Sequence, residues 1–165
     1  MRRRLVVLSL TVAVGAALVA PAGATVAAKP NACKVLKASE VTRVTGFPAQ
    51  KAADQQQGPP GSGICGYSLD DPSSPGRSVS VLVQKADPRE LKIGYKTAKT
   101  TFAESVEPVS GFGKNAFYAG GGLNTLYVLK GGTLFYVQYI VLADTDAAAI
   151  KDDVVQMAKI VQPRT

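Results

Sequence analysis

Histidine and tryptophan do not occur in this 165-residue chain, and cysteine and methionine occur only twice each. Without histidine the chain has no Ser-His pair for nucleophilic catalysis, which excludes hydrolases of the serine-protease type. The Ser-x-x-Lys spacing of penicillin-recognising enzymes is also missing. We therefore predict a protein that is not an enzyme and that uses no metal or cofactor. An enzyme working with carboxylates and tyrosines alone is the remaining catalytic alternative.

The first residues have the order of a secretory signal peptide. Three arginines follow Met1, an apolar run extends from Leu5 to Val19, and small residues occupy positions 22–24. We predict a signal peptide over residues 1–24, with residue 28 as the alternative end; the general and twin-arginine export routes both stay open. The apolar run is shorter than the roughly 20 residues of a spanning helix, and no lipid-attachment sequence precedes Cys33. The expected product is secreted, is not a lipoprotein and has no stable membrane anchor.

Removing residues 1–24 lowers the formal net charge from +7 to about +4 and leaves enough chain for one core. We expect a disordered linker over residues 25–32 and a single domain over residues 33–162. Cys33 and Cys65 both lie in the processed chain, and an exported chain with two cysteines most simply joins them. A redox pair or a metal site is the alternative, but the chain has neither Cys-x-x-Cys spacing nor histidine. A disulfide of this span would stabilise the domain by roughly 3–4 kcal/mol.

Apolar spacing and turn residues predict about three helices and about five strands. Helices are expected at residues 35–44 with Ser39 as a cap, from Asp87 and Pro88 through Phe102, and from Asp144-Thr145-Asp146 to Pro163. Strands are expected at residues 64–69, 77–85 and 115–119 and in a hairpin over 123–142, with a short edge segment near 106–109. Residues 49–62 are expected to form an exposed loop. The order α-β-β-α-β-β-β-α predicts an α+β fold with an antiparallel sheet.

The hairpin has the clearest pattern in the chain, because Gly131-Gly132 joins two apolar runs. This turn places Tyr127 opposite Tyr136 and Leu129 opposite Leu134, and alternation then sorts the side chains into two faces. Val128, Phe135 and their alternate neighbours form a core face. The other face is too apolar to be an ordinary solvated surface. Either a helix covers it, or Tyr127, Leu129, Leu134 and Tyr136 form a surface for a partner.

The strongest charge pattern is a stripe on the helix that begins at Pro88. The stripe consists of Arg89, Lys92, Lys96 and Lys99, which lie opposite the apolar side of the helix. It is either the solvated side of an amphipathic helix or a site for an anionic polymer or lipid headgroups. No aromatic residue is interleaved with the charges, so nucleic acid is not an expected partner.

Several short segments of the processed chain resemble a known family. They comprise residues 32–41, Gly46, Cys65-Gly66-Tyr67, Val79-Ser80-Val81 and residues 109–117. In these segments the chain is similar to small actinobacterial exported proteins and lipoproteins of unknown function, of the kind carrying domain of unknown function 3558. The resemblance implies an α+β fold and a disulfide between the two cysteines, and it implies no catalytic residues.

These observations lead to two hypotheses about function. The first is a secreted, non-enzymatic binding or sensor-like module that meets an unknown protein or envelope component, as a monomer or weak dimer. The second is an inhibitor of a secreted enzyme, which would insert an exposed loop, either residues 55–62 or residues 70–76, into a target cleft.

Overall fold

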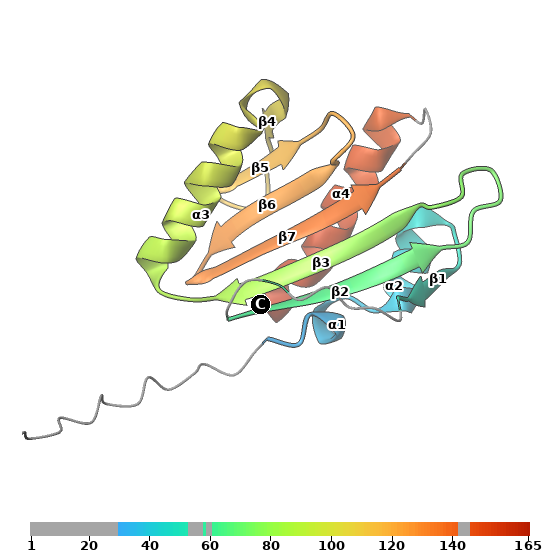
Figure 1. Ribbon diagram of the computed structural model, residues 1–165, viewed down its shortest axis with the longest axis horizontal. Helices are drawn as coiled ribbons and strands as arrows, with labels where there is room; N and C mark the ends of the chain where they lie inside the picture. The colour runs from blue at the N-terminus through green and yellow to red at the C-terminus, as the bar shows by residue number, and fades with distance from the viewer. Residues whose placement is uncertain (1–29, 53–57, 59–60, 142–145) are drawn as a thin grey trace, which may run out of the picture.

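The computed structural model describes residues 30–52, 58, 61–141 and 146–165. Seven strands form one antiparallel sheet in the order β1-β2-β3-β7-β6-β5-β4, and helices lie on both of its faces (Figure 1). The predicted α+β class with an antiparallel sheet is confirmed. The predicted counts of about five strands and three helices are wrong, because the described residues contain seven strands and four α-helices.

The elements follow one another along the chain with short 3-10 turns after α3 and α4. The helices are α1 (Ala32–Val35), α2 (Ala38–Thr45), α3 (Pro88–Thr101) and α4 (Ala147–Val161). The strands are β1 (Ala49–Lys51), β2 (Ser62–Leu69), β3 (Ser78–Lys85), β4 (Val106–Pro108), β5 (Ala116–Ala119), β6 (Thr125–Lys130) and β7 (Thr133–Ile140).

The predicted first helix is divided into α1 and α2 by Leu36. This residue has an extended backbone and is fully buried, and its carbonyl accepts a hydrogen bond from the hydroxyl of Tyr67 on β2. The break therefore buries an apolar side chain and gives the freed carbonyl a partner. The N-cap of α2 is Lys37 rather than Ser39. Residues 30–32, which we had assigned to the linker, also lie against the domain, since Ala32 begins α1 and is buried.

The two additional strands lie at the edges of the sheet. β1 occupies the start of the segment that we predicted as a loop, and it pairs with β2 from Ala49 opposite Leu69 to Lys51 opposite Tyr67. β4 lies within the expected edge segment and pairs with β5. Each edge strand is three residues long and has no apolar alternation of its own, so only its pairing identifies it as a strand.

The hairpin of β6 and β7 has the predicted register. Leu129 pairs with Leu134, and Tyr127 pairs with Tyr136. Gly131 and Gly132 have φ angles of 58° and 77°, the left-handed values that a two-residue primed turn requires. The register places Val128 and Phe135 on the core face, where both are almost fully buried.

The larger core lies between one face of the sheet and helices α1, α2 and α4. The valines of β3 and the core-face residues of the hairpin pack there against Ile150, Val154, Met157 and Val161 of α4. Ala147, at the start of α4, is exposed. The predicted disulfide is confirmed: Cys33 of α1 joins Cys65 of β2, with 5.1 Å between their Cα atoms.

A smaller core lies on the second face of the sheet, beneath α3. Leu91 and Tyr95 of α3 pack there with Phe117 of β5 and Leu134 of β7. Helix α3 begins as predicted, because the Asp87 carboxylate accepts a hydrogen bond from the Arg89 amide at 2.8 Å and Pro88 is the first helical residue. Since α3 contacts β6 and β7, it leaves the β2 and β3 half of this face uncovered by any described helix (Figure 1).

Candidate functional site

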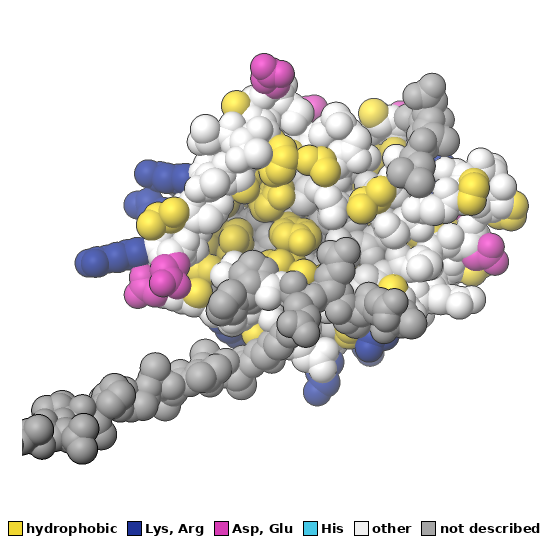
Figure 2. Space-filling model, in the orientation of Figure 1, with side chains coloured by type: hydrophobic (Ala, Val, Ile, Leu, Met, Phe, Trp, Pro, Cys, Tyr) yellow, Lys and Arg dark blue, Asp and Glu magenta, His cyan; other side chains and the backbone are white. Residues whose placement is uncertain are grey.

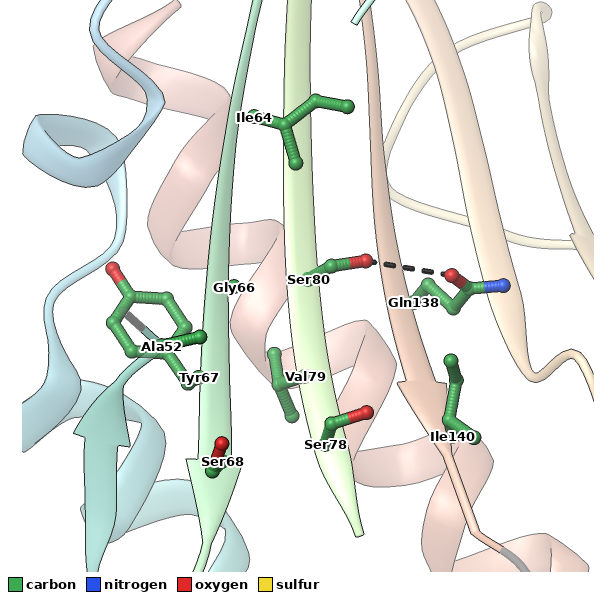
Figure 3. Close-up of a pocket in the computed structure, with 10 residues that line it drawn as sticks. All are labelled: Ala52, Ile64, Gly66, Tyr67, Ser68, Ser78, Val79, Ser80, Gln138 and Ile140. Atoms are coloured by element: carbon green, nitrogen blue, oxygen red, sulfur yellow. Dashed lines mark hydrogen bonds between the residues drawn. The ribbon is translucent and has the colours of Figure 1, made fainter. Parts of the chain in front are cut away.

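The β2 and β3 half of the second face, which no described helix covers, contains a shallow depression that we call the serine hollow. Its lining residues come from β2, β3 and β7 and from Ala52, which follows β1 (Figure 3). They are Ala52, Ile64, Gly66, Ser68, Ser78, Ser80, Gln138 and Ile140, with the backbone of Tyr67 and Val79 between them. The volume is about 180 Å³, which is below the roughly 300 Å³ at which small-molecule pockets usually begin.

The floor of the serine hollow is polar but carries no charge. The Ser80 hydroxyl donates to Oε1 of Gln138 at 3.4 Å, a long contact for two oxygen atoms. The amide nitrogen of Gln138 points away from Ser80 (Figure 3). Small residues keep the floor shallow, because among the described residues a Cβ added at Gly66 would reach only the Ala52 side chain, at 3.7 Å. The floor can therefore offer hydrogen bonds to an uncharged group.

Apolar side chains border this floor. Tyr136 precedes Gln138 on the same face of β7, and Leu82 follows Ser80 on the same face of β3 but is only 5% exposed. Tyr136 is half-buried, and burial raises the pKa of its hydroxyl. Figure 2 shows hydrophobic side chains gathered across the middle of this view, beside α3. A polar floor with an apolar border is typical of a contact surface.

The predicted partner surface lies next to the hollow, and α3 covers part of it. Leu134 is only 8% exposed and belongs with Leu91 to the second core. Tyr127 stacks on Phe117, with ring centroids 4.9 Å apart, and burial raises its pKa to about 12. Leu129 is half-buried. Of the four residues, Tyr136 is the one that borders the serine hollow.

The predicted anion-binding stripe has a different environment. Arg89, Lys92, Lys96 and Lys99 are all exposed, and none forms an ion pair with another described residue. The ion pairs in the described part of the chain are Arg77–Asp71, Lys151–Glu107 and Arg164–Glu40.

Two other hollows are formed by described residues. One, of about 440 Å³, lies at the end of α3 and contains Glu104. The other, of about 360 Å³, lies at the start of α4. In it Glu107 pairs with Lys151, and the Tyr118 hydroxyl donates to Oδ1 of the buried Asn124 at 3.0 Å. Each of these two hollows contains a single carboxylate.

The turn over residues 70–76, a candidate inhibitory loop, is held by its own side chains. Asp71 Oδ1 accepts hydrogen bonds from the Ser73 amide at 2.9 Å and the Ser73 hydroxyl at 2.7 Å, and these bonds lower the Asp71 pKa. Asp71 Oδ2 lies 3.0 Å from Arg77 Nε, and both side chains are buried. The Arg77 guanidinium also lies over the Phe47 ring at 4.8 Å. The other candidate loop lies mostly outside the described residues.

Sequence reasoning did not identify the serine hollow as a site. The signal was present, since Ser78 and Ser80 alternate with valines on β3 and Gln138 lies on the matching face of β7. Alternation alone does not show which part of that face a helix covers. The sequence therefore showed that one face of these strands is polar, but it did not show that a hollow forms there.

No family model, curated protein or solved structure matches this chain. The resemblance to the actinobacterial family therefore stays a prediction. Within the residues that the structure describes, no three His, Cys, Asp or Glu side chains lie close enough to hold a metal ion. None of the described helices has the length and apolar character needed to cross a membrane. Residues 1–24, the predicted signal peptide, lie outside the described part.

Proposed function

We propose that this protein is a secreted, non-catalytic binding module that holds a protein partner on the uncovered half of its sheet. The observation that carries the proposal is the serine hollow, a neutral hydrogen-bonding floor bordered by the half-buried Tyr136. A depression of about 180 Å³ suits one protruding uncharged side chain better than a whole small-molecule ligand. The actinobacterial resemblance and the predicted signal peptide support an extracellular or envelope location for this contact.

The chemistry of the floor favours an uncharged contact. A charged group placed on it would be partly desolvated with no opposite charge among the lining residues, which is unfavourable. Tyr136 provides an amphipathic ring at the border, of the kind enriched where proteins bind each other. We therefore expect Tyr136 and Ser80 to be central to the contact.

Filling the hollow tests this proposal. Ser80→Phe places a ring on the floor without changing the core face, and Ser110→Phe makes the same change at an exposed loop position. With tagged protein recovered from the culture medium as bait, Ser80→Phe should weaken capture of the partner at least about tenfold, whereas Ser110→Phe should not. Tyr136→Ser should also weaken capture. If no captured protein distinguishes Ser80→Phe from Ser110→Phe, the proposal is wrong.

An enzyme inhibitor remains the second candidate because the turn over residues 70–76 is held in one conformation by Asp71. Pro72 and Pro75 of this turn are exposed, and a pre-ordered loop costs little entropy when it binds. In this case Pro72→Ala with Pro75→Ala should lose the target, and Ser80→Phe should keep it. The two sets of substitutions therefore distinguish a sheet contact from a loop contact.

A further inference from the structure

Six of the twelve described Lys and Arg residues that form no ion pair with another described residue lie on α3 or near its start. The helix carries Arg89, Lys92, Lys96 and Lys99 on its exposed side. The ends of β3 and β6 nearest the start of α3 add Lys85 and Lys130. The Asp87 carboxylate is already used as the cap of α3, so Glu90 is the one acidic residue within the helix. Figure 2 shows Lys and Arg side chains projecting from the α3 side of the molecule.

One apolar side chain lies among these charges. Ile93 is 65% exposed, more than any other large hydrophobic residue in the described part of the chain. It follows Arg89 by four residues and precedes Lys96 by three, so the three side chains are neighbours on one surface of the helix. The ordinary apolar side of α3 is already buried, as the 1% exposure of Leu91 shows. Packing in the core therefore does not explain why an isoleucine occupies position 93.

We propose that the outer side of α3 docks on an anionic lipid surface. Arg89, Lys92, Lys96 and Lys99 meet the headgroups, and Ile93 enters the boundary between headgroups and acyl chains. Basic residues attract anionic lipids, and an apolar residue beside them reaches the acyl boundary, which lies about 5–10 Å below the surface. A soluble anionic polymer would satisfy the charges but would offer no apolar phase for Ile93. The helix also forms the outermost layer on its side of the sheet (Figure 1).

The expected binding is weak, reversible and sensitive to salt. Each Lys or Arg near an anionic membrane contributes about 1 kcal/mol, or roughly fivefold in the partition coefficient. Screening over a Debye length of roughly 8 Å at physiological salt reduces this contribution. This surface is distinct from the serine hollow, so either contact can exist without the other.

Vesicle co-sedimentation tests the proposal with a chain that begins at Thr25, since the apolar run of residues 5–19 would itself enter lipid. The disulfide and both cores are made of residues from Ala32 onward, so this chain retains every element of the described fold. The vesicles contain equal parts of phosphatidylglycerol and phosphatidylcholine, with pure phosphatidylcholine as the uncharged reference. We expect binding to the anionic vesicles alone, and binding should fall as salt is added.

A matched control separates the α3 surface from net charge. The test variant changes Arg89, Lys92, Lys96 and Lys99 to Gln. The control variant changes Lys34, Arg43, Lys51 and Lys159 to Gln, which removes the same charge from exposed positions on other elements. The test variant should lose at least about tenfold in vesicle affinity, and the control should lose less than about threefold. Equal losses in the two variants would overturn the proposal.

Ile93→Gln separates a lipid surface from a soluble polyanion. It should weaken vesicle binding by about three- to tenfold, because a partly inserted isoleucine loses its apolar contact. Binding of the same variant to inorganic polyphosphate should be unchanged. If Ile93→Gln binds the vesicles as wild type does, or if the wild-type chain binds polyphosphate and not the vesicles, α3 is not a lipid-docking surface.

Discussion

Gly63 lies where the chain preceding α1 passes over β2, and the backbone leaves no space there for a side chain. A Cβ at Gly63 would lie 1.9 Å from the Pro30 carbonyl oxygen and 3.3 Å from the Ala32 nitrogen. Both of these atoms belong to backbone, which cannot rotate away as a flexible side chain would. Glycine is therefore required at this position by a close approach between two segments.

We expect Gly63→Ala to lower the free energy of unfolding by about 1–3 kcal/mol, because the added methyl group overpacks this contact. Gly66→Ala is the matched control on the same strand, since among the described residues its Cβ would meet only the Ala52 side chain, at an ordinary 3.7 Å. Urea unfolding monitored by circular dichroism measures both variants. If the two variants lose similar free energies of unfolding, the segment at Pro30 moves aside to accommodate the new methyl group, and the prediction is wrong.

Asp153 on α4 is a half-buried carboxyl whose ionised form is unfavourable in the folded state. Burial raises its pKa to about 6, the nearby Asp152 adds to the rise, and Arg77 opposes it. This value lies above the ordinary 3.8, so the folded state favours the protonated form of Asp153. The protein therefore keeps its full stability below pH 3.8, where the carboxyl is protonated in the folded and unfolded states. It loses part of that stability as the pH rises through about 6, because the buried carboxyl ionises.

We therefore expect Asp153→Asn to stabilise the protein near pH 7 by about 1 kcal/mol, a value reduced for the solvent that reaches this group. The gain should disappear below about pH 4, where the wild-type carboxyl is protonated as well. Thermal unfolding of both proteins across this range measures the difference. A loss of stability near neutral pH in Asp153→Asn would mean that the carboxylate is instead needed by Arg77.

At the scale of the elements, α3 has two sides with different roles. Its inner side holds Leu91 and Tyr95 against the sheet, and the Tyr95 ring meets Phe117 edge-on at 5.2 Å. Its outer side holds Ile93 and the basic stripe. The stability of the helix thus depends on one side, and the proposed lipid contact depends on the other.

Two substitutions on this helix separate the two roles. Leu91→Ala should lower the free energy of unfolding by about 2–4 kcal/mol, because it leaves a cavity in the smaller core. Ile93→Ala, two residues away, should change it by less than about 0.5 kcal/mol, because its side chain is mostly exposed. Chemical denaturation of both variants is the measurement. A large effect of Ile93→Ala would show that this side chain already packs within the domain.

The hairpin and the two long helices were predictable because their signals are local. Two glycines with positive φ determine the turn, and alternation then determines the register of Tyr127 with Tyr136. Asp87 and Pro88 similarly determine the start of α3. In contrast, β1 is identified only by its pairing with β2. The sequence indicated β4 only as a short edge segment, and its pairing with β5 identifies it as a strand.

At the scale of the whole molecule, the two ends of the described chain lie against the same region. Arg164, near the C-terminus, donates to both carboxylate oxygens of Glu40 on α2, at 2.7 and 2.9 Å, and to the Val35 carbonyl at 3.0 Å. This pairing lowers the Glu40 pKa. The disulfide joins α1 to β2 in the same region, so the segment from α1 to α2 is tied both to the sheet and to the residues that follow α4.

The placement of α3 also determines how the second face of the sheet is used. The sequence predicted that this face was either covered by a helix or exposed to a partner, and both arrangements occur in different halves. Leu134 lies under α3, whereas Ser80 and Gln138 do not. The sites proposed above, the serine hollow and the outer side of α3, both follow from this partial cover.

The sequence by itself determined the antiparallel α+β class, the hairpin register and the amphipathic sides of α3 and α4, because each depends on residues close together in the chain. It also made the Cys33–Cys65 pairing the simplest arrangement for two cysteines. Only the tertiary structure decided how far α3 reaches across the sheet and where small residues leave a hollow. Both features depend on packing between segments that are distant in the sequence, and the periodicity within one segment gives no information about that packing.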